Sequence, residues 1–342
     1  MGLLNTSMDT TEESESILVQ APGRTCLFGN HQDYLGLPVI ACDIHRHIVL
    51  RATKNSAGKF RIHKPDIGEY RVIDIMDKIE YVEKEDHLLA AIKILATYGC
   101  IPNSGYDICI KGNITINAGT SSSSAVVVAW IRFMTTAFGC ERIVTKELIS
   151  RLAYEAEVAF HGSSGGKMDQ YSIALGHVIY LETSGTDYHE IFETRIPGPI
   201  VGESGIPKQT TGVLWELKEK ALLAIAKVRE RLPTFDIRQV SGQEFPKYAE
   251  YIPDDLKICF EAAVLNHDIT QRALLEFRKP SLELETIGKL MNEHYHVLKE
   301  YLKITLPLID DMVHAALRAG ALGGKIVGYG RGGSIVALAL PD

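Results

Sequence analysis

The sequence lacks the features that mark several large classes of protein. Its six cysteines include no C-x-x-C pair, so buried free thiols in a reducing compartment are expected rather than disulfides. No apolar run approaches the roughly 18 residues of a membrane-spanning helix. Residues 1–16 are polar and acidic, without the basic and apolar regions of a secretory signal. The net charge of -7 argues against a nucleic-acid partner. These absences predict a cytoplasmic globular protein that begins with a disordered tail over 1–16.

The two common glycine-rich nucleotide signatures are also missing. No lysine follows the glycine of the most conspicuous small-residue loop, and three spaced glycines are absent at the same strand-to-helix turn. That loop lies between a strand-like run over 106–116 and an apolar helical run over 126–138. A flexible linker rarely joins two such elements directly. The loop consists of Gly119, Thr120, Ser121, Ser122, Ser123 and Ser124.

We interpret this serine loop as a phosphate-binding loop. A small-residue turn that opens a helix points several unpaired backbone N–H groups in one direction, and the helix dipole adds positive potential there. The serine hydroxyls add donors and a possible magnesium ligand. Without a lysine, the loop needs its counter-charge from a metal ion or from a distant basic residue.

Hydrophobic periodicity predicts an α+β chain in two parts, 17–200 and 201–342, separated by a Gly- and Pro-rich loop over 196–212. The first part is predicted to be rich in strands and the second in helices, with no internal repeat. Strands are expected at 17–20, 39–53, 60–62, 70–75, 106–116 and 178–182, and helices at 87–98, 126–138 and 145–160. The second part is expected to have helices at 213–231, 256–278, 282–301 and 306–319, followed by a glycine-punctuated strand over 325–340.

Three other segments carry chemically unusual residues. After the first predicted strand, a turn gathers five polar side chains within eleven positions: Arg24, Asn30, His31, Asp33 and Tyr34. His31 and Asp33 can both hydrogen-bond to vicinal hydroxyls, as a polyol site requires, although a surface Asx turn is the alternative. Glycines recur through 323–333, which indicates either close backbone approach to a ligand or loop, or a tight hairpin.

The third segment pairs two carboxylates across a glycine-rich turn. Glu157 lies in a predicted helix that stops near Gly165 and Gly166, and Asp169 precedes the next apolar run. Asp169 could simply cap that run. Alternatively, one carboxylate binds a metal ion and the other acts as a base.

Together these ordered motifs resemble the GHMP kinase superfamily, and within it the galactokinases, from about residue 17 onward. The motifs are Pro22-Gly23-Arg24, Gly29-x-His31-x-Asp33-Tyr34, the serine loop, Gly166-x-Met168-Asp169-Gln170 and Gly328–Gly333. The resemblance implies an N-terminal α/β half of the S5 domain 2-like type, which binds ATP, and a helix-rich, ferredoxin-like C-terminal half.

The same resemblance implies a role for each motif in ATP-dependent phosphorylation of the anomeric hydroxyl of a monosaccharide. Asp169 matches the proposed base, and Arg24 an arginine that keeps this carboxylate ionised and stabilises the transferred phosphoryl group. Ser123 and Glu157 match the Mg²⁺ ligands, and Gly119–Ser124 would wrap the triphosphate. The sugar would meet Asn30, His31, Asp33, Tyr34, Gly166 and Lys167. No membrane or nucleic-acid partner is implied, and both a monomer and a homodimer remain open.

One departure from the galactokinase pattern concerns the substrate. Galactokinases usually carry Glu where this chain has Asn30, and an amide, unlike a carboxylate, would tolerate an anionic group at C6 of the sugar. Glucuronokinases resemble this chain in having Asn at the matching point, and the segment around Lys167 resembles bacterial heptose-phosphate kinases. A uronic acid or heptose is therefore an alternative to galactose. A sensor that binds ATP and sugar without catalysis is another. A mevalonate- or homoserine-type kinase is disfavoured by Asp33-Tyr34 and Met168-Asp169-Gln170.

Overall fold

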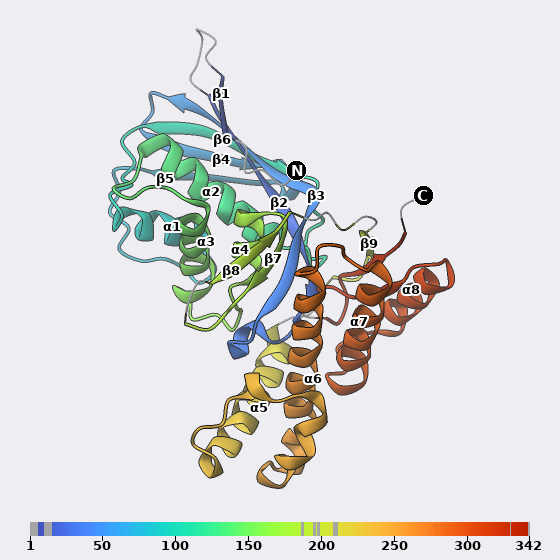
Figure 1. The fold of residues 1–342 in the computed structure, drawn as a ribbon. Coiled ribbons are helices and arrows are strands. Elements are labelled where there is room, and N and C mark those ends of the chain that lie inside the picture. Colours follow the sequence, from blue (N-terminus) through green and yellow to red (C-terminus); the bar gives the residue numbers. More distant parts are fainter. Residues whose placement is uncertain are drawn as a thin grey trace.

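The computed structural model describes residues 6–9, 16–185, 188–193, 196, 199–207, 211–328 and 330–340. Over this part of the chain it shows two lobes, one with a large sheet covered by helices and one built mainly of helices (Figure 1). This arrangement confirms the two-part α+β fold. The long strands β2 (Ser16–Phe28) and β3 (Val39–Asn55) extend through the first lobe and approach α6 of the second (Figure 1).

In the described residues the first lobe has an eight-stranded sheet. Its strand order is β1-β2-β3-β6-β4-β5, with β7 paired to β3 and β8 paired to β7. All pairs are antiparallel except β4 with β6. The other strands are β1 (Thr6–Asp9), β4 (Lys59–Lys64), β5 (Glu69–Asp74), β6 (Gly105–Gly112), β7 (Val178–Leu181) and β8 (His189–Phe192).

The structure differs from two expectations at the start of the chain. The expected tail over 1–16 contains β1, which pairs antiparallel with Ser16–Val19 because the outer edge of β2 offers backbone groups for pairing. Residues 1–5 and 10–15 lie outside the described part. The strand predicted at 17–20 continues to Phe28, and its pairing with β3 shifts register between Pro22 and Arg24, where proline has no N–H to donate. Arg24 therefore projects from a strand and not from a turn.

The helices of the first lobe pack on this sheet. They are α1 (His87–Ala96), α2 (Ser122–Phe138), α3 (Lys146–Tyr154) and α4 (Met168–Leu175), and α3 continues into a π-helical turn over Glu155–Ala159. On α2, the rings of Trp130 and Phe133 contact the Phe60 ring of β4 edge-on, at 5.6 and 6.1 Å between centroids. This buried contact fixes α2, and so fixes the direction in which its N-terminus and the serine loop face.

The second lobe contains the four predicted helices, α5 (Thr211–Arg231), α6 (Asp254–Phe277), α7 (Leu284–His296) and α8 (Pro307–Arg318). A π-helical turn over Val297–Tyr301 extends α7. The strand predicted over 325–340 is two strands, β10 (Gly323–Ile326) and β11 (Ser334–Leu338), because the glycines between them form a turn. The loop predicted over 196–212 contains β9 (Pro199–Glu203), which pairs with β11. The boundary proposed between 200 and 201 passes through β9, and the division into 17–200 and 201–342 stays a prediction.

The glycine-rich turn between β10 and β11 packs against the serine loop of the first lobe. A Cβ added to Gly328 would lie 3.4 Å from the Cα of Gly119, and one on Gly333 would lie 2.9 Å from the carbonyl oxygen of Ala118. Ser334 Oγ donates to the same carbonyl at 2.7 Å. The close approach that these glycines indicated is thus to a loop. Tyr329 of this turn lies outside the described residues.

Within the described residues, no helix has both the length and the hydropathy that crossing a membrane requires. The six cysteines are free thiols, as expected, but Cys109 and Cys140 are partly exposed and not buried.

Candidate active site

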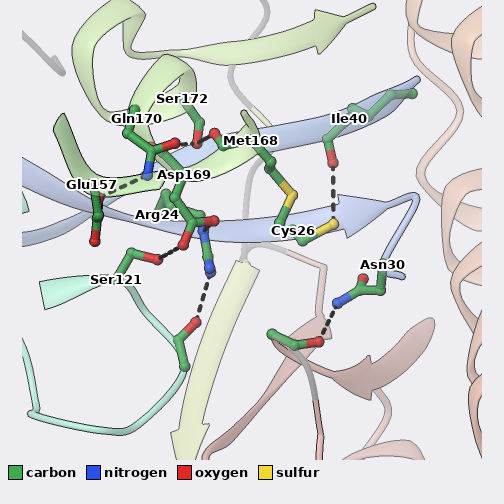
Figure 2. A network of polar contacts seen from close by, with 12 residues as sticks. Arg24, Cys26, Asn30, Ile40, Ser121, Glu157, Met168, Asp169, Gln170 and Ser172 are labelled. Atoms are coloured by element: carbon green, nitrogen blue, oxygen red, sulfur yellow. Dashed lines mark hydrogen bonds and ion pairs between the residues drawn. The ribbon is translucent and has the colours of Figure 1, made fainter. Parts of the chain in front are cut away.

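Arg24 and Asp169, the predicted arginine and base, are 145 positions apart in the sequence and in contact in the structure (Figure 2). Arg24 Nε donates to Asp169 Oδ1 at 2.7 Å, and Arg24 Nη1 donates to the carbonyl oxygen of Gly119 at 2.6 Å. The Arg24 side chain is 2% exposed and that of Asp169 18% exposed. Because the guanidinium is almost fully withdrawn from water, its attraction for the carboxylate is weakly screened. The pair joins strand β2 to the first turn of α4 and to the serine loop.

The serine loop contacts the same carboxylate directly. Ser121 has a left-handed backbone, with φ 60° and ψ 49°, immediately before α2 begins. Its Oγ donates to Asp169 Oδ2 at 2.6 Å (Figure 2). A non-glycine residue in this region is strained, and such strain is typical of functional sites. Both oxygens of Asp169 therefore have fixed donors, and the hydroxyl of Ser121 is used for positioning the carboxylate.

Glu157 lies on the π-helical turn next to the start of α2. Gln170 Nε2 donates to Glu157 Oε2 at 2.7 Å (Figure 2). Burial raises the pKa of Glu157, and hydrogen bonds from Gln170, Ser124 and Ser123 oppose that shift. The structure thus brings Ser123 and Glu157 together, as the predicted metal site requires.

This donor set fits Mg²⁺. A carboxylate and a hydroxyl are hard oxygen ligands, which this ion prefers, and it commonly uses one or two carboxylates together with substrate phosphates. Burial raises the pKa of Glu157, so a cation beside this carboxylate would favour its charged form.

The predicted sugar-binding residues begin with Asp33, in the short 3₁₀ turn Asp33–Leu35. The side chain is buried, and Oδ1 accepts the Tyr34 backbone N–H at 3.0 Å. Among the described residues Oδ2 has no hydrogen-bond partner. Burial and the nearby charge of Asp169 raise the pKa of Asp33 to about 6. A buried carboxylate oxygen without a donor is a ready acceptor for a ligand hydroxyl.

Gly166 lies against this carboxyl group. A Cβ at 166 would fall 2.8 Å from Asp33 Cβ and closer still to its carboxyl atoms, so the close approach requires glycine. The side chains of His31 and Tyr34 are hydrogen-bonded to each other, with His31 Nδ1 3.0 Å from the phenol oxygen of Tyr34. Lys167 precedes α4, and its Nζ lies 5.8 and 5.9 Å from the ring centres of Tyr154 and Tyr171.

Asn30 is buried between the two lobes. Its Nδ2 donates to the carbonyl oxygen of Gly328 at 2.8 Å, and its Oδ1 accepts from Lys325 Nζ at 2.6 Å. Lys325 is fully buried, with two further acceptors in the carbonyl oxygens of Cys26 and Ile326. Burial lowers the pKa of Lys325 to about 8. In this structure the amide of Asn30 is thus committed to protein partners, which the sequence did not indicate.

A cavity of about 960 Å³ lies beside the serine loop. Gly119, Ser121, Ser122 and Ser123 form one part of its wall, and another part comes from β4, β5, β6 and the segment before α1. Arg71 and Asp86 brace that wall with two hydrogen bonds of 2.9 and 2.6 Å. Sequence reasoning missed these lining residues, because their segments carry no recognisable motif: Lys64, Tyr70, Arg71, Tyr81 and Asp86.

Three family models match the chain along the segments that form this site. The GHMP kinases N-terminal domain matches residues 81–177, the GHMP kinases C-terminal model 274–342, and a galactokinase galactose-binding signature 9–54. The chain belongs to the GHMP kinase superfamily. It is accordingly an ATP-binding kinase.

The similar proteins include both mevalonate kinases and galactokinases. A mevalonate kinase of Thermococcus sibiricus is 28% identical over 332 residues, covering 94% of this chain and 89% of that protein. A galactokinase of Thermotoga neapolitana is 26% identical over 327 residues, covering 94% and 88%. The crystal structure of Lactococcus lactis galactokinase complexed with galactose superposes with a TM-score of 0.84 at 25% identity, covering 96% of this chain and 86% of that one. Methanococcus jannaschii mevalonate kinase shares the fold, with a TM-score of 0.69 at 18% identity and coverages of 94% and 90%. The acceptor has to be inferred from the site.

Proposed function

We propose that this kinase transfers the terminal phosphoryl group of ATP to the anomeric hydroxyl of a monosaccharide, with Asp169 as the base. The observation that carries the proposal is the position of Asp169, held by Arg24 and Ser121 at the mouth of the serine loop. Asp33 Oδ2, in a carboxyl group near enough to feel the charge of Asp169, supplies an acceptor for a sugar hydroxyl. The galactose-binding signature over 9–54 covers Arg24 and Asp33 and favours a sugar as acceptor.

In this mechanism the chain mainly positions groups and neutralises charge, which is what phosphoryl transfer asks of a protein. The serine loop and the N-terminus of α2 hold the triphosphate through backbone N–H groups, and the nucleoside occupies the 960 Å³ cavity. Ser123 and Glu157 would hold Mg²⁺, which would supply charge neutralisation on the phosphates. Asp169 accepts the proton of the attacking hydroxyl on one of its carboxylate oxygens. Arg24 stabilises the negative charge of this carboxylate and of the transferred phosphoryl group.

A sugar acid or heptose is the second candidate for the acceptor. Asn30, whose amide is hydrogen-bonded to Gly328 and Lys325, carries no charge where galactokinases usually carry Glu, and Lys325 is a buried cation that donates to three uncharged oxygens. Both features lower the electrostatic cost of binding an acceptor that carries an anionic group in this region. A non-catalytic sensor is the third reading, which the presence of Asp169 and of the complete serine loop disfavours.

The test is an ADP-release screen of the purified protein with galactose, galacturonate, glucuronate, a heptose phosphate and mevalonate. Asp169→Asn keeps the shape of the side chain and removes the base, so we expect kcat to fall by about 10²–10⁴-fold while ATP binding by calorimetry is retained. Asp311→Asn, an exposed position on α8, is the control and should match the wild type. Turnover that survives in Asp169→Asn, or ADP release that requires mevalonate, would contradict the proposal.

A further inference from the structure

Lys218 is a charged residue on the buried face of α5. The residues of this helix that pack inward recur at helical spacing: Leu214, Ala221, Ala224, Ile225 and Val228. Lys218 follows Leu214 by four positions and precedes Ala221 by three, so it shares their face. Lysine is strongly hydrated, and a half-buried lysine on an inward face needs a reason.

The side chain of Lys218 extends from the second lobe to the predicted sugar-binding segments of the first. Its Nζ donates to the carbonyl oxygen of Ser164 at 3.3 Å and lies 6.0 Å from the ring centre of Tyr34. Ser164 belongs to the turn that presents Gly166 to Asp33, and Tyr34 is the neighbour of Asp33 in sequence. The ammonium group therefore stands where the two sugar-binding segments meet.

Other lysines of α5 have carboxylate partners. Lys220 pairs with Glu216 at 2.6 Å and Lys227 with Glu230 at 2.9 Å. Within the described part of the chain, no carboxylate oxygen lies within 4 Å of Lys218 Nζ, whose hydrogen-bond acceptor there is the neutral Ser164 carbonyl. Lys218 thus combines partial burial, a neutral acceptor and a place beside the sugar site.

We propose that Lys218 binds an anionic substituent of the acceptor, a carboxylate or a phosphate, so that the substrate is a sugar acid or sugar phosphate with a free anomeric hydroxyl. This inference rests on the proposed sugar kinase function and specifies its substrate class. Asn30 is consistent with this class only in that it adds no negative charge to the lobe interface, since its amide is bonded to Gly328 and Lys325. Lys218 is a binding residue in this account and takes no part in the proton transfer.

The experiment compares Lys218→Met with Lys220→Met, a matched change two residues away that removes the lysine paired with Glu216. Steady-state kinetics would use galactose, galacturonate, glucuronate and galactose 6-phosphate, so that carboxylate and phosphate substituents are separated. We expect Lys218→Met to raise KM for the preferred anionic acceptor by about 10–100-fold, with kcat and the KM for ATP within about threefold of the wild type. Lys218→Arg should recover most of the loss, and Lys220→Met should match the wild type.

Three results would overturn the inference while leaving a sugar kinase in place. The first is a wild-type kcat/KM that is higher for galactose than for the anionic acceptors. The second is a Lys218→Met variant whose kcat/KM falls equally for charged and neutral acceptors. The third is a Lys218→Met variant in which only the KM for ATP rises. If the wild type phosphorylates none of these sugars and no heptose phosphate, the proposed function itself fails. Thermal unfolding of each variant checks that the lobes remain assembled, and a Lys218→Met protein that unfolds is replaced in the test by Lys218→Gln.

Discussion

Replacing Gly166 by alanine tests the contact between the glycine-rich turn and Asp33. The backbone of Gly166 lies outside the left-handed region, so alanine meets no conformational penalty there and the effect is purely steric. The new Cβ would fall 2.8 Å from Asp33 Cβ and closer to the carboxyl atoms, against an ordinary contact of 3.4–4 Å. The carboxyl group must therefore move by about 1 Å, and a misplacement of that size in a binding site costs about 10²-fold in rate.

We expect Gly166→Ala to lower kcat/KM for the sugar by about 10²-fold and to leave the KM for ATP nearly unchanged, because the serine loop is untouched. Gly212→Ala is the control, since a Cβ there meets nothing within 4 Å. The double variant Gly166→Ala with Asp33→Ala should be no worse than Asp33→Ala alone, because the displaced group is already gone. A Gly166→Ala enzyme with wild-type kcat/KM, or losses that add in the double variant, would refute the assignment of Asp33 to the sugar.

Two further predictions concern buried carboxylates. Because the pKa of Asp33 is raised to about 6, its contribution to stability is fully present below about pH 4 and is lost as pH rises through 6. The unfolding free energy of the wild type relative to Asp33→Asn, measured by urea titration, should accordingly fall by up to about 3 kcal/mol between pH 4 and 7. If the unfolding free energies of the two proteins change in parallel with pH, the prediction is contradicted. Glu157→Gln should raise the Mg²⁺ concentration for half-maximal rate by about tenfold or more, because a carboxylate ligand is lost. It should leave the metal-free melting temperature unchanged or higher, since burial already disfavours the charge, and unaltered Mg²⁺ dependence would exclude Glu157 as a ligand.

Local patterns predicted most of the secondary structure, because hydrophobic periodicity and small-residue turns act over a few residues. The helices at 87–98 and 126–138 and the strands at 60–62 and 70–75 were found within a few residues of their observed ends. The errors occur where pairing between strands decides the conformation, because the pattern within one segment does not show which partner it has. Thr6–Asp9 and Pro199–Glu203 become strands because β2 and β11 offer partners, and the strand after Ile17 continues past Pro22 because β3 supports it.

The sequence by itself determined which chemical groups the candidate site contains: a serine loop opening a helix, an arginine and a carboxylate in glycine-rich surroundings, and a second acidic residue. Only the tertiary structure decided how these groups are used. It directs the Ser121 hydroxyl to Asp169, occupies the amide of Asn30 with Lys325 and Gly328, and brings Lys218 from the second lobe to Tyr34. The reason is physical. Residue types and local spacing specify what a side chain can bind, whereas its actual partners depend on the packing of α2, α4 and α5 against strands far away in the chain.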